Sequence, residues 1–241
     1  MALETMTILT QDRIEEMNAK GIWPKGLLLD RVARLVETQP DAVAVTGINS
    51  MRGRIETVSY NQLWRYARRI AIGLAELGVE KGEVVSYQLP NWWEFTALHL
   101  ACLHIGAITN PVMPIFRQRE LSFMLDYAES KVFIAPKTFR NYDHQAMIEE
   151  LRPALPKLEY VFILDGEGDA SFETHFLERR WEEEVDAEAF FVARRPDPND
   201  IIEILYTSGT SGVPKGVLHT SNTLLSLADT GREWLGLTPD D

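Results

Sequence analysis

Apolar residues recur along this chain with two spacings that take turns. The first is a spacing of three or four residues, which places apolar side chains on one face of a helix. The second is a short compact run without strict alternation, which is typical of strands buried on both faces of a sheet. The first pattern predicts helices over residues 10–17, 27–39, 59–77, 91–105, 119–129, 141–153 and 221–236. The second predicts strands over residues 42–47, 54–59, 83–89, 107–112, 131–136, 159–164, 201–206 and 217–220.

Polar residues at the edges of these segments indicate where helices begin and end. Ser59 and Gln62 have the spacing of a capping box, in which each side chain bonds the free backbone amide of the other residue. Asn91 and Glu94 repeat that spacing ahead of the next helix. Gly106 follows the last apolar residue of that helix, where glycine commonly ends a helix in a left-handed conformation.

The order of the elements predicts the fold class. Strands and helices alternate, and the strands lack the polar face that an antiparallel sheet would show to water. We therefore expect an α/β fold with a largely parallel sheet flanked by helices, the sheet spanning about residues 55–165. The acidic segment 165–191 is interpreted as a solvated helix face and connection, and residues 194–200 as a linker rich in proline and aspartate.

Composition limits which partners the protein is expected to bind and in which cellular compartment it is expected to lie. The chain has 241 residues and a formal net charge of −12, and so acidic a surface disfavours nucleic acid and anionic lipid. Cys102 is the single cysteine, which fits a reducing, cytoplasmic location. The N-terminus lacks the pattern of a signal peptide. The longest apolar stretch, residues 95–108, contains two histidines and is shorter than the ~18 residues expected of a membrane span.

A loop between the last two predicted strands is the main candidate for chemistry. The sequence YTSGTSGVPKGV, residues 206–217, combines hydroxyl side chains, glycines and one lysine. Glycine lets backbone amides approach an anion closely, and lysine adds a mobile positive charge. The candidate phosphate-binding site consists of Thr207, Ser208, Gly209, Thr210, Ser211, Gly212, Val213, Pro214 and Lys215.

Two better-known motifs do not fit this loop. A Walker A motif needs Gly-Lys-Ser/Thr, but Pro214 precedes Lys215 and Gly216 follows it. A Gly-x-Ser-x-Gly elbow fails because Val213 stands where its second glycine should be. A hairpin turn with incidental hydroxyls is the simpler interpretation, since glycine, serine and threonine are common in turns. Residue chemistry alone leaves both interpretations open.

Other clusters give weaker signals. His99, Cys102 and His104 share one predicted helix, but their gaps of three and two residues do not place all of them on one face, so core packing is favoured over a metal site. Trp92 and Trp93 could line an acyl pocket, although packing under the sheet is the favoured interpretation. The run 182–184 of three glutamates is interpreted as a surface charge cluster.

The loop carries a family resemblance. Residues 206–217 closely resemble the phosphate-binding signature of the adenylate-forming superfamily, which includes acyl-CoA synthetases, luciferase-like enzymes and adenylation domains of peptide synthetases. Ser211 replaces the usual second threonine and keeps the hydroxyl group. The upstream sequence is also similar to that family, most of all to cyclohexanecarboxylate or medium-chain acyl-CoA ligases. His219 stands upstream of the family's usual histidine position, so no role is carried over to it.

The resemblance implies an ATP-dependent two-step reaction. A carboxylic acid attacks the α-phosphate of ATP with Mg²⁺, giving an acyl-adenylate and pyrophosphate, and coenzyme A then takes the acyl group and releases AMP. Residues 207–215 would close over the β- and γ-phosphates. The implied partners are a small carboxylic acid, ATP and coenzyme A, without nucleic acid or a membrane span, and self-association into a homo-oligomer is left open.

The resemblance also sets an expectation for domain organisation. The later motifs of the family, its small C-terminal domain and its adenylation lysine are absent from these residues. Residues 1–241 are thus expected to form the incomplete N-terminal part of the AMP-binding large domain, with one subdomain over about 55–195 and the start of another over about 200–241. We expect no catalytic residue in this chain, which would be an inactive portion of a ligase. The alternative is a non-catalytic nucleotide-binding or interaction module.

Overall fold

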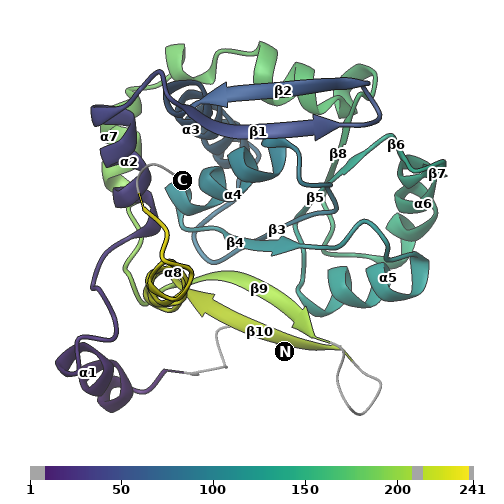
Figure 1. The fold of residues 1–241 in the computed structure, drawn as a ribbon. Coiled ribbons are helices and arrows are strands. Elements are labelled where there is room, and N and C mark those ends of the chain that lie inside the picture. The colour runs from purple at the N-terminus through teal and green to yellow at the C-terminus, as the bar shows by residue number, and fades with distance from the viewer. Residues whose placement is uncertain (1–8, 208–213, 239–241) are drawn as a thin grey trace.

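A six-stranded sheet forms the centre of the computed structural model, which describes residues 9–207 and 214–238 (Figure 1). Its strand order is β10-β9-β4-β3-β5-β8. All neighbouring strands are parallel except β10, which pairs antiparallel with β9 at one edge. The strands are β3 (Val84–Tyr87), β4 (Ile108–Pro111), β5 (Val132–Pro136), β8 (Tyr160–Leu164), β9 (Ile201–Thr207) and β10 (Lys215–Thr220).

Helices cover both faces of this sheet. On β5, Val132 and Ile134 pack with α3 and α4, whereas Phe133 and Ala135 point to the opposite face and pack with α5 and α6. The uninterrupted apolar sequence of the strand therefore fills two cores at once. The helices are α1 (Gln11–Ala19), α2 (Leu28–Thr38), α3 (Tyr60–Glu76), α4 (Trp93–Ile105), α5 (Gln118–Tyr127), α6 (His144–Leu151), α7 (Ala187–Ala193) and α8 (Ser221–Leu235).

The connections make the sheet doubly wound. The chain passes from β3 through α4 to β4, then returns through α5 to β5 on the other side of β3. In such sheets, ligands bind outside the carboxyl ends of the strands. Because β9 is parallel to β4, its carboxyl end at Thr207 opens onto this edge. The predicted α/β class, with a largely parallel sheet flanked by helices, is confirmed.

The predicted extent of the sheet, about residues 55–165, is wrong. The six-stranded sheet begins at Val84 and continues through β9 and β10 to Thr220. Strands β1 (Val43–Asn49) and β2 (Arg54–Ser59) form a separate antiparallel pair that lies over α3 and α4 (Figure 1). The strand patterns themselves are correct, but a local pattern does not state which strand will be the partner. The division into subdomains near residue 200 stays a prediction.

One predicted capping box is confirmed and the other is wrong. The backbone amide of Ser59 donates to Gln62 Oε1 at 2.9 Å, and the amide of Gln62 donates to Ser59 Oγ at 3.3 Å. Helix α4 instead begins one residue later than expected, with Trp92 as its N-cap and no side-chain cap bond. The partner of Glu94 is instead the guanidinium of Arg52, which donates to its Oε1 at 2.8 Å.

The acidic connection is more ordered than the sequence indicated. It forms short 3₁₀ and π turns, and Phe172, Phe176 and Trp181 are buried against the core. The glutamate run 182–184 is only partly a surface cluster, since Glu182 pairs with the mostly buried Arg69 of α3. The apolar residues between the acids, rather than the acids, determine how this segment lies.

Gly73 is expected to be required where this segment crosses α3. A Cβ added at Gly73 would lie 2.8 Å from Trp181 Nε1 and 2.9 Å from Phe176 Cδ1. We expect Gly73→Ala to lower the free energy of unfolding by roughly 1–2 kcal/mol, because the steric cost exceeds the gain in helix propensity. Urea denaturation measures this effect. Gly231→Ala in α8 should stabilise the protein instead, because a Cβ added at Gly231 would meet no neighbouring heavy atom within 4 Å. Equal shifts in both variants would contradict the steric explanation.

Candidate functional site

Strands β9 and β10, which stand on either side of the candidate loop in the sequence, pair with each other at one side of the sheet (Figure 1). Thr207 ends β9 and Lys215 begins β10, and the two residues are cross-strand partners with exposed side chains. Within residues 9–207 and 214–238, no carboxylate forms an ion pair with Lys215. Three of the nine predicted site residues, Thr207, Pro214 and Lys215, belong to the described structure. Ser208, Gly209, Thr210, Ser211, Gly212 and Val213 lie outside the described residues.

Helix α5 anchors β9 just before the loop. The hydroxyl of Tyr206 donates to the carbonyl oxygen of Met124 in α5 at 3.1 Å, and burial raises the pKa of this phenol, which keeps it a donor. Opposite Tyr206, a Cβ on Gly216 would lie 3.1 Å from Ile204 Cγ2. The tyrosine of the motif thus ties β9 to α5, and a side chain at position 216 would crowd Ile204.

Helix α8 holds the other end of β10. Thr220 and Thr223 form a reciprocal cap, with the Thr220 amide donating to Thr223 Oγ1 at 2.9 Å and the Thr223 amide to Thr220 Oγ1 at 3.3 Å. Asn222 is buried, accepts from the amide of Lys25 at 3.0 Å and donates to Asn199 Oδ1 at 3.0 Å. Three segments far apart in the sequence therefore meet where β10 ends.

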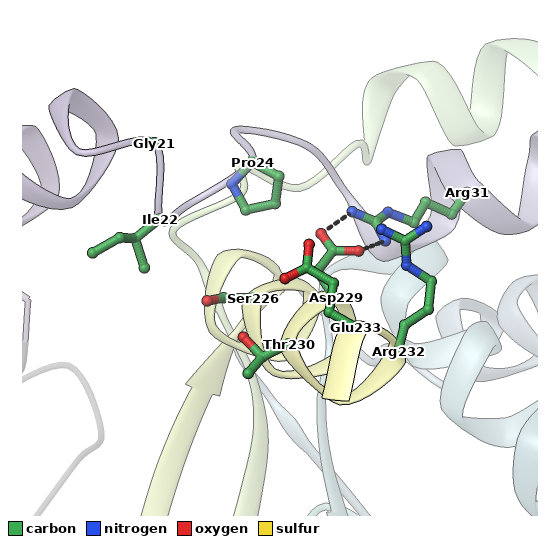
Figure 2. Close-up of a pocket in the computed structure, with 9 residues that line it drawn as sticks. All are labelled: Gly21, Ile22, Pro24, Arg31, Ser226, Asp229, Thr230, Arg232 and Glu233. Carbon is green, nitrogen blue, oxygen red and sulfur yellow. Dashed lines mark hydrogen bonds and ion pairs between the residues drawn. The ribbon is translucent and has the colours of Figure 1, made fainter. Parts of the chain in front are cut away.

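A charged groove of about 630 Å³ runs along the outer side of α8 (Figure 2). Arg31 of α2 donates two hydrogen bonds of 2.6 Å to Asp229, and the bond to Arg31 lowers the pKa of that carboxyl group. Arg232 and Glu233 bring further opposite charges to the same lining. The groove lies along α8, and the whole of β10 separates this helix from Lys215 in the chain. We therefore assign the groove to the contact between α2 and α8 rather than to the phosphate site.

Polar side chains also fix the carboxyl edge itself. Gln88, just after β3, donates to the carbonyl oxygens of Met113 and Phe116 at 3.0 Å each, and its Oε1 lies 3.1 Å from His144 Nδ1. Burial, with a contribution from Arg117, lowers the pKa of His144 to about 4, so the neutral ring donates from Nδ1. The segments that follow β3 and β4 are thereby tied to the start of α6.

Glu203 is the residue at this site that sequence reasoning missed. It lies in the middle of β9, is 7% exposed, and places Oε1 3.8 Å from His99 Nδ1. Burial raises the pKa of this carboxyl to about 7 and lowers that of His99 to about 4. The available signal was one acidic residue inside the apolar run IIEILY, residues 201–206, which a strand buried on both faces does not ordinarily contain.

The weaker candidates are packed into the core. Trp92 is 3% exposed and packs edge-on against Phe139, with ring centroids 6.0 Å apart. His104 lies between the rings of Trp64 and Phe191, at 4.5 and 4.8 Å. Across the part of the chain that the structure describes, no three His, Cys, Asp or Glu side chains are grouped so as to hold a metal ion. Over the same residues, no helix combines the length and apolar content needed to cross a bilayer.

Together, these features define a doubly wound α/β domain with a hydroxyl- and glycine-rich hairpin at the edge where such sheets bind ligands. Residues 32–241 match the sequence model of the AMP-binding enzyme family. The chain belongs to this family, and its resemblance to adenylate-forming enzymes is confirmed.

Relatives with known roles match the same region. The medium-chain fatty-acid–CoA ligase of Escherichia coli (strain K12) is 30% identical over 207 residues, which are 86% of this chain and 35% of the relative. An acetyl-coenzyme A synthetase of Rubrobacter xylanophilus is 32% identical over 198 residues, covering 78% and 30% of the two chains. The apo structure of Mycobacterium smegmatis MbtA has a TM-score of 0.75 and 27% identity, over 97% of this chain and 41% of that one. The chain thus spans about a third of the length of these curated relatives.

Proposed function

We propose that this chain is a nucleotide-binding part of an AMP-forming acid–thiol ligase, with residues 207–215 binding the β- and γ-phosphates of ATP. The observation that supports this most is the hairpin that places Thr207 opposite Lys215 at the carboxyl edge of the sheet. The donor set fits an anion, because an exposed lysine, hydroxyl groups and glycine amides offer positive charge and hydrogen-bond donors but no carboxylate. Family membership and the two acyl-CoA-forming relatives support the same proposal.

In the proposed reaction, a carboxylic acid attacks the α-phosphate of ATP, and pyrophosphate leaves as the acyl-adenylate forms. The thiol of coenzyme A then attacks the acyl carbon, and AMP leaves. Lys215 would neutralise charge on the departing pyrophosphate. Mg²⁺ bound to the phosphates would supply further charge neutralisation.

We further propose that these 241 residues bind nucleotide without completing adenylation, since they match about a third of the curated relatives. The alternative is a non-catalytic nucleotide-binding or interaction module that is not part of a ligase. Carboxylate-dependent exchange of pyrophosphate into ATP tests whether these residues catalyse adenylation. Exchange above background would overturn the proposal that they cannot complete this step. The cytoplasmic location, the homo-oligomer and the choice of carboxylic acid stay predictions or open points.

Lys215→Ala tests the phosphate site. We expect about tenfold weaker binding of MgATP, because one exposed cation that faces the phosphates is lost. Isothermal titration calorimetry at fixed ionic strength gives the affinity. Lys157→Ala is the matched control, since it removes the same charge from an exposed position between α6 and β8. Equal affinities in the two variants, or no nucleotide binding by the unaltered chain, would remove the basis of the proposal.

A further inference from the structure

Glu203 is an ionisable group buried in the strand that leads into the phosphate loop. Its neighbours along β9, Ile202 and Ile204, are 0% and 2% exposed. The residue lies four positions before Thr207, which at a strand rise of about 3.3 Å per residue separates them by roughly 13 Å. A charge at Glu203 is therefore close enough to act on an anion bound at Thr207, the first residue of the proposed phosphate site.

The groups that the described structure places next to Glu203 carry no permanent charge. His99 of α4 lies 3.8 Å away, and the hydroxyl of Tyr87 in β3 lies 3.4 Å from His99 Nδ1. In the sheet, Thr109 of β4 and His219 of β10 are the cross-strand partners of Glu203. Cys102, one turn along α4 from His99, is also buried. None of these side chains supplies a fixed cation to balance an ionised carboxylate.

The carboxyl group of Glu203 is the member of this cluster that changes charge near neutral pH. Burial raises its pKa to about 7. Burial lowers the pKa of His99 to about 4 and also lowers that of His219, so both rings are neutral at pH 7. The pKa of Tyr87 is raised well above its usual range, and burial likewise raises that of the Cys102 thiol. Ionisation of Glu203 therefore adds a negative charge to the strand that ends at Thr207, and none of the described groups named above balances it.

We propose that Glu203 links nucleotide binding to pH, with the loop holding ATP more tightly when this buried carboxyl group is protonated. The inference rests on the proposed phosphate-binding function of residues 207–215 and adds a control to it. For an anion bound at Thr207, about 13 Å from Glu203, an effective dielectric constant of about 20 with partial screening by salt gives a change in affinity of roughly threefold to tenfold. By reciprocity, bound ATP favours the protonated carboxyl group by the same factor.

The test compares MgATP affinity from pH 6 to pH 8.5 in the unaltered chain, Glu203→Gln and Glu37→Gln. Glutamine keeps the shape of the protonated carboxyl group, and Glu37 is an exposed glutamate of α2 whose change removes the same charge. Because ATP titrates in this range too, the informative quantity is the ratio between variants. We expect Glu203→Gln to match the unaltered chain at pH 6 and to bind threefold to tenfold more tightly at pH 8.5, while Glu37→Gln follows the unaltered chain.

The outcomes separate this inference from the function on which it rests. Measurable ATP binding with parallel pH profiles in all three proteins overturns the role of Glu203 and leaves the phosphate site standing. Absence of ATP binding in all of them at every pH overturns both. Glu203→Met, which is neutral and of similar length, repeats the comparison if the amide disturbs folding, and a pH profile like that of the unaltered chain would again contradict the proposal.

Discussion

Replacing Arg52 with methionine is expected to lower the free energy of unfolding by about 3–5 kcal/mol at neutral pH. Arg52 lies in the turn between β1 and β2 and reaches across to the carboxyl edge of the main sheet. Its guanidinium lies 2.8 Å from Glu94, 3.3 Å from Glu56 and 3.1 Å from Asp165. With its side chain 17% exposed, this partly buried cation pairs with four carboxylates, the fourth being Glu173 at 3.7 Å.

Most of the expected loss comes from Glu94. Its side chain is 2% exposed, and its Oε2 atom has no hydrogen-bond partner. Burial already raises the pKa of Glu94, although the hydrogen bond from Arg52 opposes that shift. Without Arg52 the pKa rises further, so the carboxyl group either stays charged in an apolar site or takes up a proton. The destabilisation should thus be smaller at pH 5 than at pH 8, because protonation at low pH removes the buried charge.

Urea denaturation at both pH values, followed by circular dichroism, measures this prediction. Arg54→Met is the control, because Arg54 is 64% exposed and its pair with Glu56 should contribute less than about 1 kcal/mol. The double variant Arg52→Met with Glu94→Gln should recover most of the loss, since it removes the most deeply buried of the carboxylates that lose their cation. Equal effects of Arg52→Met and Arg54→Met, or a double variant no more stable than Arg52→Met, would show that the cluster is not the anchor described here.

The same cluster explains why local sequence reasoning succeeded at one helix and failed at the next. Ser59 and Gln62 find each other within one helical turn, so their pattern is sufficient to predict their bonds. Glu94 has the same local opportunity with Asn91, but Arg52 approaches from 42 residues away and binds it instead. A long-range ion pair overrides a cap that contributes about 1 kcal/mol. Nothing in the residues around Glu94 announces that partner.

The extent of the sheet and the candidate site show the same limit. Apolar runs located each strand of the central sheet, because burial on both faces leaves a signature in the strand itself. Pairing of β9 with β4 joins residues about 90 positions apart, as between Thr109 and Glu203, and has no local signature. The loop motif could be recognised because it is one contiguous stretch of sequence. The environment of Glu203 was not, since it is assembled from α4, β3, β4 and β10.

Glu203 should also make the stability of the protein depend on pH. Its pKa is about 7 in the folded chain and 4.5 as the ordinary value, which approximates the unfolded chain. The folded state therefore binds more protons than the unfolded state between these values, and the stability from the neutral carboxyl group is complete below pH 4.5 and lost as pH rises through 7. A shift of this size corresponds to about 3 kcal/mol in total, of which about 2 kcal/mol falls between pH 5.5 and pH 8.5.

Glu203→Gln removes this titration and keeps the shape of the neutral carboxyl group. Relative to the unaltered chain, the variant should gain about 2 kcal/mol in free energy of unfolding on going from pH 5.5 to pH 8.5. Any constant cost of the amide cancels, because the comparison is a difference between two pH values. Glu37→Gln, at an exposed position of α2, should show no such gain. A flat difference for Glu203→Gln would mean that the carboxyl group is already charged at pH 5.5, and the link between the loop and pH would then fail with it.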